Sequence, residues 1–335
     1  MNNIFNTDEQ INVVFLGGSI TEGAGASSKK NCFANLTGEW LKTKFGSKLN
    51  YHNKGVGGTP SAYGLLRFER DVAAYNPDMI FIEFAVNDSG NDTRKYVEGL
   101  VRSFISLPKK PYVVFLYTTN AVYETKTSYF EEVAEYYGIP QISLKNALKN
   151  HLNGENAKEA GYLKDNVHPT DLGYRVYFEE MVRCLSDKAY YKRPLEKSAK
   201  LVDDCITAHT VFTPSWETEL TGSWQKGETD FGKCITGAVG DSLEFEFDGD
   251  IVAFEHGLHK DGTMYEVYDN GTLIGTGNSK YKDFITNQLV MGFRTFDLEY
   301  GHHKIKVINV KNDIDDGTNK QVLFYNIITG EKTER

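Results

Sequence analysis

A serine flanked by glycines follows the first apolar run of the chain. Residues 12–16 (NVVFL) lead directly into Gly17, Gly18 and Ser19. Open α/β sheets place ligands at the carboxyl ends of their strands, and glycines there let the backbone turn sharply and leave a hydroxyl uncovered. Ser19 is therefore a candidate nucleophile, with an ordinary glycine-serine turn as the alternative. A phosphate-binding loop does not fit, because GGSITEGAG lacks both the GK[ST] ending and the G-x-G-x-x-G spacing.

A serine nucleophile needs a base to remove its proton, and the base needs an acid to orient it. The segment DNVHP supplies Asp165 and His168 three residues apart, directly before Pro169. That offset can bring the carboxylate to the imidazole within one turn of chain. The alternative is a loop that enters a helix, with Asp165 as its N-terminal cap. His52 and His151 lack such a local acid.

Two further segments contain groups that can donate hydrogen bonds to the oxyanion of an acyl-transfer intermediate. Residues 53–59 (NKGVGGT) contain glycines that can present a backbone N–H, and residues 85–88 (AVND) contain Asn87, whose amide can donate. The backbone N–H of Ser19 is a third candidate. Each segment has turn chemistry as its alternative, because glycine and asparagine both favour left-handed backbone conformations.

The order of these segments, GGSIT, NKGVGGT, AVND and DNVHP, resembles the SGNH, or GDSL-type, serine hydrolase family over roughly residues 10–186. The resemblance implies a flavodoxin-like α/β/α fold and ester hydrolysis without a metal or other cofactor. It also implies a role for each candidate residue: Ser19 as nucleophile, His168 as general base, Asp165 as orienting acid, and Ser19, Gly58 and Asn87 as oxyanion-hole donors.

The sequence departs from the family pattern at two positions. Gly18 stands where the family usually has Asp, and Ala85 stands where it usually has Gly. Gly18 leaves the triad intact because Asp165 supplies the acid. The methyl group of Ala85 lies near the expected oxyanion site, where it would narrow the acyl pocket. Gly57 adjoins Gly58, so the donor in this loop can be either residue.

A parallel sheet is needed to bring these segments together. Residues 12–16, 79–84 and 112–117 are short β-branched and aromatic runs, as expected for strands buried on both faces. Helical spacing of apolar residues predicts helices at 32–45, 96–105, 129–137 and 172–185. This alternation predicts a three-layer α/β domain with right-handed crossovers over residues 1–190.

The pattern changes after about residue 187, where a charged segment precedes strands of alternating polarity. The predicted strands span 242–249, 251–256, 264–275, 303–310 and 322–328, and Asp269-Asn270-Gly271 predicts a hairpin turn. We therefore expect an antiparallel β-sandwich over residues 200–335. Some of its aromatic residues are expected to be exposed or to face the catalytic domain, because they exceed what the inner faces need: Trp216, Trp224, Phe231, Phe254, Tyr265, Tyr268, Tyr281, Phe284 and Phe293. The sandwich is expected either to stabilise the chain or to position the substrate.

The net charge of −9 disfavours nucleic acid and anionic membranes as partners. No apolar run approaches the roughly 20 residues that a spanning helix needs. No Lys or Arg precedes Lys29 and the first apolar core is short, so no secretory signal is predicted and the protein is expected to be cytoplasmic, although a trimmed secreted chain would look the same. The four cysteines are expected to be reduced and mostly buried: Cys32, Cys184, Cys205 and Cys234.

Two histidine pairs raise the question of a metal site. His256 and His259 form H-x-x-H, but on a predicted strand and turn this spacing does not align both rings as a helix would. His302 and His303 are neighbours and so point to opposite faces of a strand. We predict surface or turn histidines and no metal.

Together the segments predict a serine esterase that hydrolyses short O-acyl esters. The resemblance to SGNH enzymes with added β-domains implies an acetyl group on a carbohydrate, as a small molecule or an oligosaccharide, and the aromatic-rich sandwich could hold sugars by stacking. An acyltransferase with the same triad and a non-catalytic carbohydrate-binding protein are the alternatives. The acyl length, the alcohol and the oligomeric state are not readable from the sequence.

Overall fold

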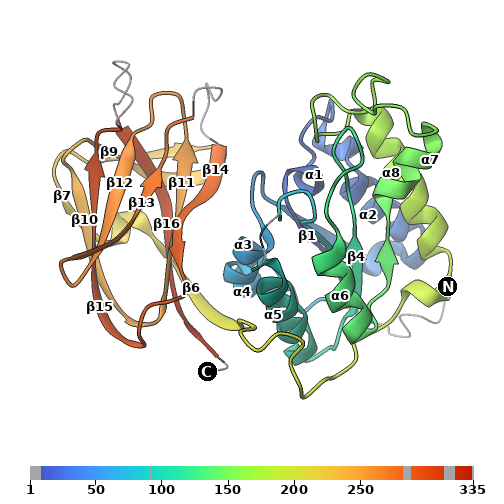
Figure 1. Cartoon of the computed structure of the whole chain (residues 1–335), viewed down its shortest axis with the longest axis horizontal. Helices are drawn as coiled ribbons and strands as arrows, with labels where there is room; N and C mark the ends of the chain where they lie inside the picture. Colours follow the sequence, from blue (N-terminus) through green and yellow to red (C-terminus); the bar gives the residue numbers. More distant parts are fainter. Residues whose placement is uncertain (1–8, 89, 91, 282–287, 313–320, 334–335) are drawn as a thin grey trace. The chain divides into compact units, whose positions relative to one another are not determined.

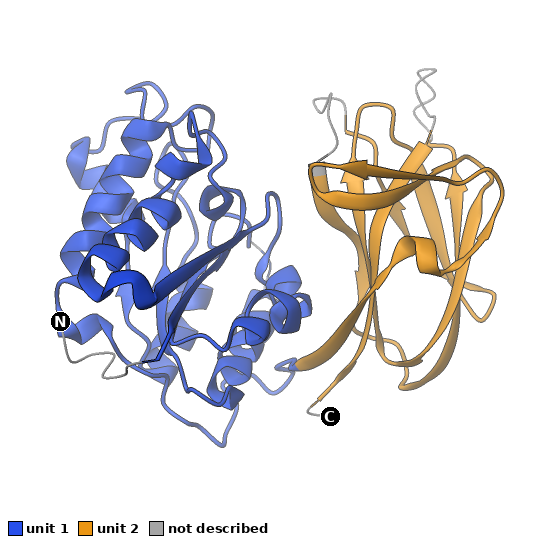
Figure 2. Ribbon diagram, turned by 180° about the vertical axis from the view of Figure 1, so that it is seen from behind, with its two compact units in different colours: residues 1–207 blue, residues 208–335 orange. Residues whose placement is uncertain are grey.

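The chain folds into two compact units, Met1–Thr207 and Ala208–Arg335 (Figures 1 and 2). The computed structural model describes residues 9–88, 90, 92–281, 288–312 and 321–333. The observed division after Thr207 lies further along the chain than the boundary predicted between residues 190 and 200. Its physical cause is a buried carboxylate in the first unit: Glu98 accepts hydrogen bonds from the backbone N–H groups of Leu201 and Val202 at 2.7 and 2.9 Å.

The first unit is built on a parallel five-stranded sheet with the order β2-β1-β3-β4-β5. This is the flavodoxin-like order, in which ligands bind at the carboxyl edge where the strand order reverses. Its strands are β1 (Ile11–Gly17), β2 (Leu49–Gly55), β3 (Met79–Glu83), β4 (Tyr112–Leu116) and β5 (Gln141–Ile142).

Helices cover both faces of this sheet. In one layer α2 and α7 contact α8, and in the other α5 contacts α3 and α6 (Figure 1). The α-helices are α1 (Ser19–Glu22), α2 (Phe33–Phe45), α3 (Ser61–Leu66), α4 (Phe68–Asp71), α5 (Thr93–Ser106), α6 (Ser128–Tyr137), α7 (Leu144–His151) and α8 (Asp171–Leu185).

The predicted α/β/α fold and three of its strands are confirmed, and each predicted helix corresponds to an observed one. The strand runs are buried on both faces because side chains from β1 alternate between the two helical layers. On one face Phe15 stacks on Phe81 with ring centroids 4.7 Å apart. The helices α1, α3, α4 and α7 were not predicted, and neither were β5 and β2 as named strands. The residues of β2 after Leu49 are only half-buried, so they lack the apolar run that marks the central strands.

The second unit is an antiparallel β-sandwich, as predicted. One sheet has the order β13-β12-β15-β10-β7, and the other has the order β14-β11-β16-β9-β8, with β6 also paired to β16. The strands are β6 (Ala208–Pro214), β7 (Glu219–Thr221), β8 (Gln225–Thr229), β9 (Gly232–Ala238), β10 (Ser242–Gly249), β11 (Ile251–Leu258), β12 (Met264–Asp269), β13 (Thr272–Asn278), β14 (Gln288–Thr295), β15 (Gly301–Val310) and β16 (Gln321–Lys332). The hairpin between β12 and β13 turns at Asn270 and Gly271, both with positive φ.

Most of the named aromatic residues of the sandwich pack against its core, and some exposure is present, as expected. Phe254 and Tyr265 are fully buried, and Trp216, Trp224 and Phe293 pack against the same cluster. Tyr281 is exposed, whereas Phe284 lies outside the described residues. The two sheets of a sandwich need wide side chains to fill the space between them, which accounts for the composition.

The histidine prediction for this unit was wrong at two positions. His256 is buried on β11 against the rings of Tyr265 and Phe324, because an inward position of a central strand overrides the polarity of the side chain. His303 is also buried, and it bonds to Asp269 at 2.8 Å, while its neighbour His302 is exposed on the other face.

All four cysteines are free and buried, as predicted. Among the helices that the structure describes, none combines the length and the apolar character that crossing a bilayer requires.

Candidate active site

The carboxyl end of β1 turns sharply into α1 and places Ser19 at the first position of that helix. The side chain is only 9% exposed. Gly18 has no room for a side chain, because a Cβ there would lie 2.4 Å from Oδ1 of Asn87. The glycine that replaces the usual aspartate therefore lets Asn87 lie directly against the nucleophile turn.

Ser19, His168 and Asp165 form a continuous chain of hydrogen bonds. Oγ of Ser19 lies 2.9 Å from Nε2 of His168, and Nδ1 of His168 lies 2.7 Å from Oδ2 of Asp165. With a neutral imidazole protonated at Nδ1, the serine hydroxyl donates to Nε2 and the ring donates to the carboxylate. This arrangement can move a proton from the hydroxyl to the imidazole while the carboxylate holds the ring in place.

The loop that holds the base is stabilised mainly by its own backbone. Oδ1 of Asp165 accepts from the N–H groups of Val167 and His168, both at 2.9 Å, and the N–H of Lys164 donates to the carbonyl of His168 at 2.8 Å. A bond of 2.8 Å from the N–H of Ala121 to the carbonyl of Asn166 ties the loop to the segment after β4. The bonds within this loop thus orient Asp165 and His168 relative to one another, independently of Ser19.

These bonds also set the charge of the acid. Partial burial opposes ionisation of Asp165, but the hydrogen bonds from the His168 ring and from the two backbone N–H groups outweigh it, so the pKa of Asp165 lies below its usual value. The carboxylate stays ionised at neutral pH and can stabilise a protonated imidazole.

The glycine loop after β2 and the segment after β3 contain the other candidate donors. The N–H of Gly57 donates to the carboxylate of Glu22 at 2.9 Å, whereas Gly58 is exposed and, among the described residues, its N–H has no bonded acceptor. The geometry thus favours Gly58 over Gly57 as the free donor. After β3, the side-chain amide N–H group of half-buried Asn87 likewise has no hydrogen-bond acceptor among the residues that the structure describes.

Glu83 at the end of β3 is a polar residue of the site that the sequence analysis missed. Its carboxylate accepts from the hydroxyls of Thr21 at 2.9 Å and Thr118 at 2.6 Å, and its carbonyl accepts from the N–H of Gly18. It thus joins α1, β3 and the segment after β4 beneath the nucleophile. The sequence did contain a sign of this role, because Glu83 is a charged residue inside the apolar run MIFIEF.

In the described ranges, no group of three or more His, Cys, Asp or Glu side chains is placed to hold a metal ion. The residues brought together here are those of a proton-transfer chain.

Residues 15–176 match the family model of the GDSL-like lipase/acylhydrolase family. The catalytic unit is a GDSL-like acylhydrolase domain. This domain belongs to a family of acylhydrolases, which are carboxylic ester hydrolases, and the resemblance stated from the sequence is confirmed over these residues. A comparison with curated proteins finds no match.

Solved structures share the fold of the whole chain. A two-domain esterase active on acetylated mannans, crystallised with mannopentaose, is 21% identical, has a TM-score of 0.80, and is matched over 98% of this chain and 92% of its own. A second structure of an esterase with the same description is 22% identical, with a TM-score of 0.79 and coverages of 98% and 93%. Both units of this chain therefore occur together in a known architecture.

The contact between the segment that follows α1 and the loop that holds His168 provides a first test. Gly25 has φ +89°, and a Cβ there would lie 2.5 Å from the Pro169 carbonyl oxygen and 3.0 Å from the His168 Cβ. Gly46 has φ +79° with open space around it. Both Gly25→Ala and Gly46→Ala incur about 1–2 kcal/mol of backbone strain, but only Gly25→Ala displaces the base. We expect kcat to fall at least about tenfold in Gly25→Ala alone. Equal kcat values in the two variants would contradict this contact.

The carboxyl of Glu83 provides a second test, through the pH dependence of stability. Burial raises its pKa to about 7, although the hydrogen bonds from Thr118 and Thr21 oppose the rise. An unfolded glutamate loses its proton near pH ~4.3. Between that pH and about 7 the folded chain holds a proton that the unfolded chain has lost, so the free energy of unfolding falls as pH rises.

Glu83→Gln removes this titration, so its free energy of unfolding should fall less between pH 4.5 and 7.5 than that of the parent protein. Urea unfolding of the full chain at several pH values in this range, followed through the transition of the first unit, measures this difference in free energy. Glu159→Gln, which removes an exposed carboxylate, serves as the control. Parallel curves for the parent and Glu83→Gln would show that Glu83 does not keep its proton in the fold.

Proposed function

We propose that this protein is a serine esterase that removes O-acetyl groups from a carbohydrate through an acyl-enzyme. The observation that carries the proposal is the hydrogen-bonded chain from Ser19 through His168 to Asp165 at the carboxyl edge of the sheet. The polypeptide itself supplies the nucleophile, the base and the oxyanion donors of this mechanism.

In the first half-reaction, Oγ of Ser19 attacks the ester carbonyl carbon as its proton passes to Nε2 of His168. The backbone N–H groups of Ser19 and Gly58 and the amide of Asn87 donate to the oxyanion that develops. The intermediate collapses to acyl-Ser19, and the departing sugar hydroxyl takes the proton from His168. Asp165 stabilises the imidazolium throughout, in keeping with its lowered pKa.

In the second half-reaction, His168 takes a proton from water, and the resulting hydroxide attacks the acyl-enzyme carbonyl. The same donors hold the second oxyanion. Collapse releases acetate and returns the proton to Ser19. Water is thus the only further reactant needed to regenerate the free enzyme.

Two observations support a short acyl group on a sugar. Ala85, which stands where the family usually has Gly, is only 2% exposed and so places a methyl group in the packed segment next to Asn87. The two-domain esterases that share both units of this chain act on acetylated mannans. We therefore expect acetyl esters of oligosaccharides, with manno-oligosaccharides first among them, to be substrates.

Acetylated manno-oligosaccharides, acetylated xylo-oligosaccharides and p-nitrophenyl esters of increasing chain length test the substrate class. We expect kcat/KM to fall by at least about tenfold from the acetate to the octanoate ester, because each added methylene must enter the narrowed pocket. Product analysis with added acceptor sugars separates hydrolysis from acyl transfer. Preference for the octanoate, or acetyl transfer in place of acetate release, would overturn the proposal.

Substitutions in the triad test the mechanism. Ser19→Ala and His168→Ala should each lower kcat by about 10⁴-fold or more, since triad members act as a unit, and Asp165→Asn should retain more activity. Buried Ser103→Ala and exposed His151→Ala serve as controls. Activity of Ser19→Ala within tenfold of the parent would remove the nucleophile assignment.

A further inference from the structure

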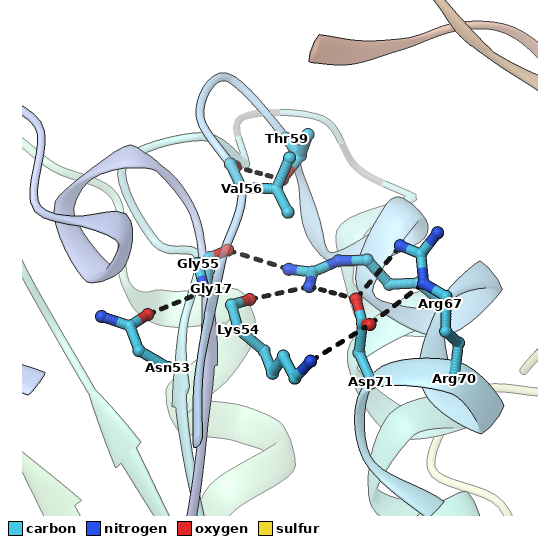
Figure 3. Close-up of polar contacts among 9 residues, drawn as sticks. All are labelled: Gly17, Asn53, Lys54, Gly55, Val56, Thr59, Arg67, Arg70 and Asp71. Carbon is cyan, nitrogen blue, oxygen red and sulfur yellow. Dashed lines mark hydrogen bonds and ion pairs between the residues drawn. The ribbon is translucent and has the colours of Figure 1, made fainter. Parts of the chain in front are cut away.

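Arg67, at the end of α3, is a charged side chain with no exposed surface. Its Nη1 donates to the carbonyl of Lys54 at 2.7 Å and to Oδ2 of Asp71 at 2.9 Å, and its Nη2 donates to the carbonyl of Gly17 at 2.9 Å. Figure 3 shows the guanidinium between the two strand ends on one side and Asp71 on the other. Arg67 belongs neither to the proposed triad nor to the proposed oxyanion donors.

The two carbonyls belong to the segments that lead into the catalytic groups. Gly17 ends β1 and lies two residues before Ser19, while Lys54 lies four residues before Gly58. The sheet ladder between these strands stops here: Gly17 pairs with Gly55, and the N–H of Val56 donates to the Gly17 carbonyl at 3.1 Å. Beyond this point, the loop turns away and is closed by the Thr59 hydroxyl on the Val56 carbonyl at 2.6 Å (Figure 3).

A planar guanidinium presents its N–H groups in a fixed fork. By bonding to Gly17 and Lys54 together, Arg67 sets the distance and the angle between β1 and β2 at the last point where the two strands are still paired. Small changes at that point are carried into the positions of Ser19 and Gly58, because only short stretches of backbone separate them.

The cost of this arrangement argues against a purely stabilising role. Removing a guanidinium completely from water costs several kcal/mol, and apolar replacements of buried ion pairs are often as stable or more stable. The Nε of Arg67 is buried without a hydrogen-bond partner, so the site does not satisfy even its own donors. Burial raises the pKa of Asp71, but the guanidinium of Arg67, and after it that of Arg70, outweighs this effect, so the pKa of Asp71 lies below its usual value and the carboxylate stays ionised beside Arg67.

We propose that Arg67 is a positioning residue that holds the Ser19 and Gly58 backbone N–H groups at the spacing required to bind the oxyanion. This inference rests on the proposed function, since it concerns the donors assigned there. Arg67 touches neither substrate nor reacting atoms and acts through the two carbonyls alone. Its effect falls on the transition state, where the oxyanion exists, and not on the binding of the ester.

The decisive variant is Arg67→Lys, which keeps the positive charge beside Asp71 but offers a single ammonium in place of the fork. With p-nitrophenyl acetate we expect kcat to fall about 10- to 100-fold with KM within about threefold, because a misplaced donor weakens the transition state alone. Arg70→Met is the matched control. Arg70 lies on α4 with Asp71 and bonds to the same carboxylate, but it does not bond to Gly17 or Lys54. The kcat of Arg70→Met should therefore stay within about twofold of the parent value.

Rates must be expressed per functional site, counted by stoichiometric reaction with a fluorophosphonate. A merely structural Arg67 would lower the number of functional sites and the melting temperature while leaving kcat per site at the parent value, and that result would overturn the inference. If Arg67→Lys yields no folded protein, the pair Arg67→Met with Asp71→Leu removes both buried charges together and gives the same comparison.

The outcomes also separate this inference from the proposed function. If Ser19→Ala keeps the parent activity, the proposed function fails. If Ser19→Ala is inactive and Arg67→Lys keeps the parent kcat per site, the proposed function stands and the positioning role fails.

Discussion

The candidate active site depends on how closely the carboxyl ends of β1 and β2 approach α1, the helix that begins at Ser19. A Cβ at Gly17 would lie 2.1 Å from the Thr21 hydroxyl oxygen, and a Cβ at Gly55 would lie 2.1 Å from the Glu22 backbone nitrogen. These two glycines are paired in the sheet. Because neither position has room for a side chain, α1 packs directly on the strand ends. Ser19, the glycine loop and Asn87 can then face one small volume, which a tetrahedral intermediate requires.

Two kinds of interaction complete the site, and they differ in range. The contacts of the loop that holds His168 are local: Asp165 bonds to Val167 and His168 of its own turn, so the carboxylate and the imidazole orient one another within a few residues. The nucleophile and its donors come from distant segments and rely on buried polar side chains that bridge strand ends. Glu83 does this between α1 and β4, and Arg67 does it between β1 and β2. Buried groups of this kind cost stability, and their placement beneath the site accounts for their retention.

The sequence predicts the features that depend on neighbouring residues, and it does not predict those that depend on distant segments. The short apolar runs predict the central strands, and the three-residue spacing of Asp165 and His168 predicts their contact, because both depend on neighbouring residues. Arg67 lies in LLRFERD, which has the composition of an ordinary solvated helix, and only the docking of α3 on the strand ends makes it buried. The burial of His256 likewise depends on the second sheet of the sandwich, which alternation along one strand cannot reveal. The cytoplasmic location stays a prediction.

The central claim is that the polypeptide forms a covalent acyl-enzyme at one serine. Reaction of the full chain with a fluorophosphonate, followed by proteolysis and peptide mass spectrometry, tests it most directly, because a phosphonyl group transferred to the nucleophile stays attached. The account predicts one adduct per chain on the peptide that contains Ser19, loss of esterase activity in proportion to labelling, and much slower labelling of His168→Ala. An adduct on another residue, or full esterase activity in a chain labelled at Ser19, would contradict it.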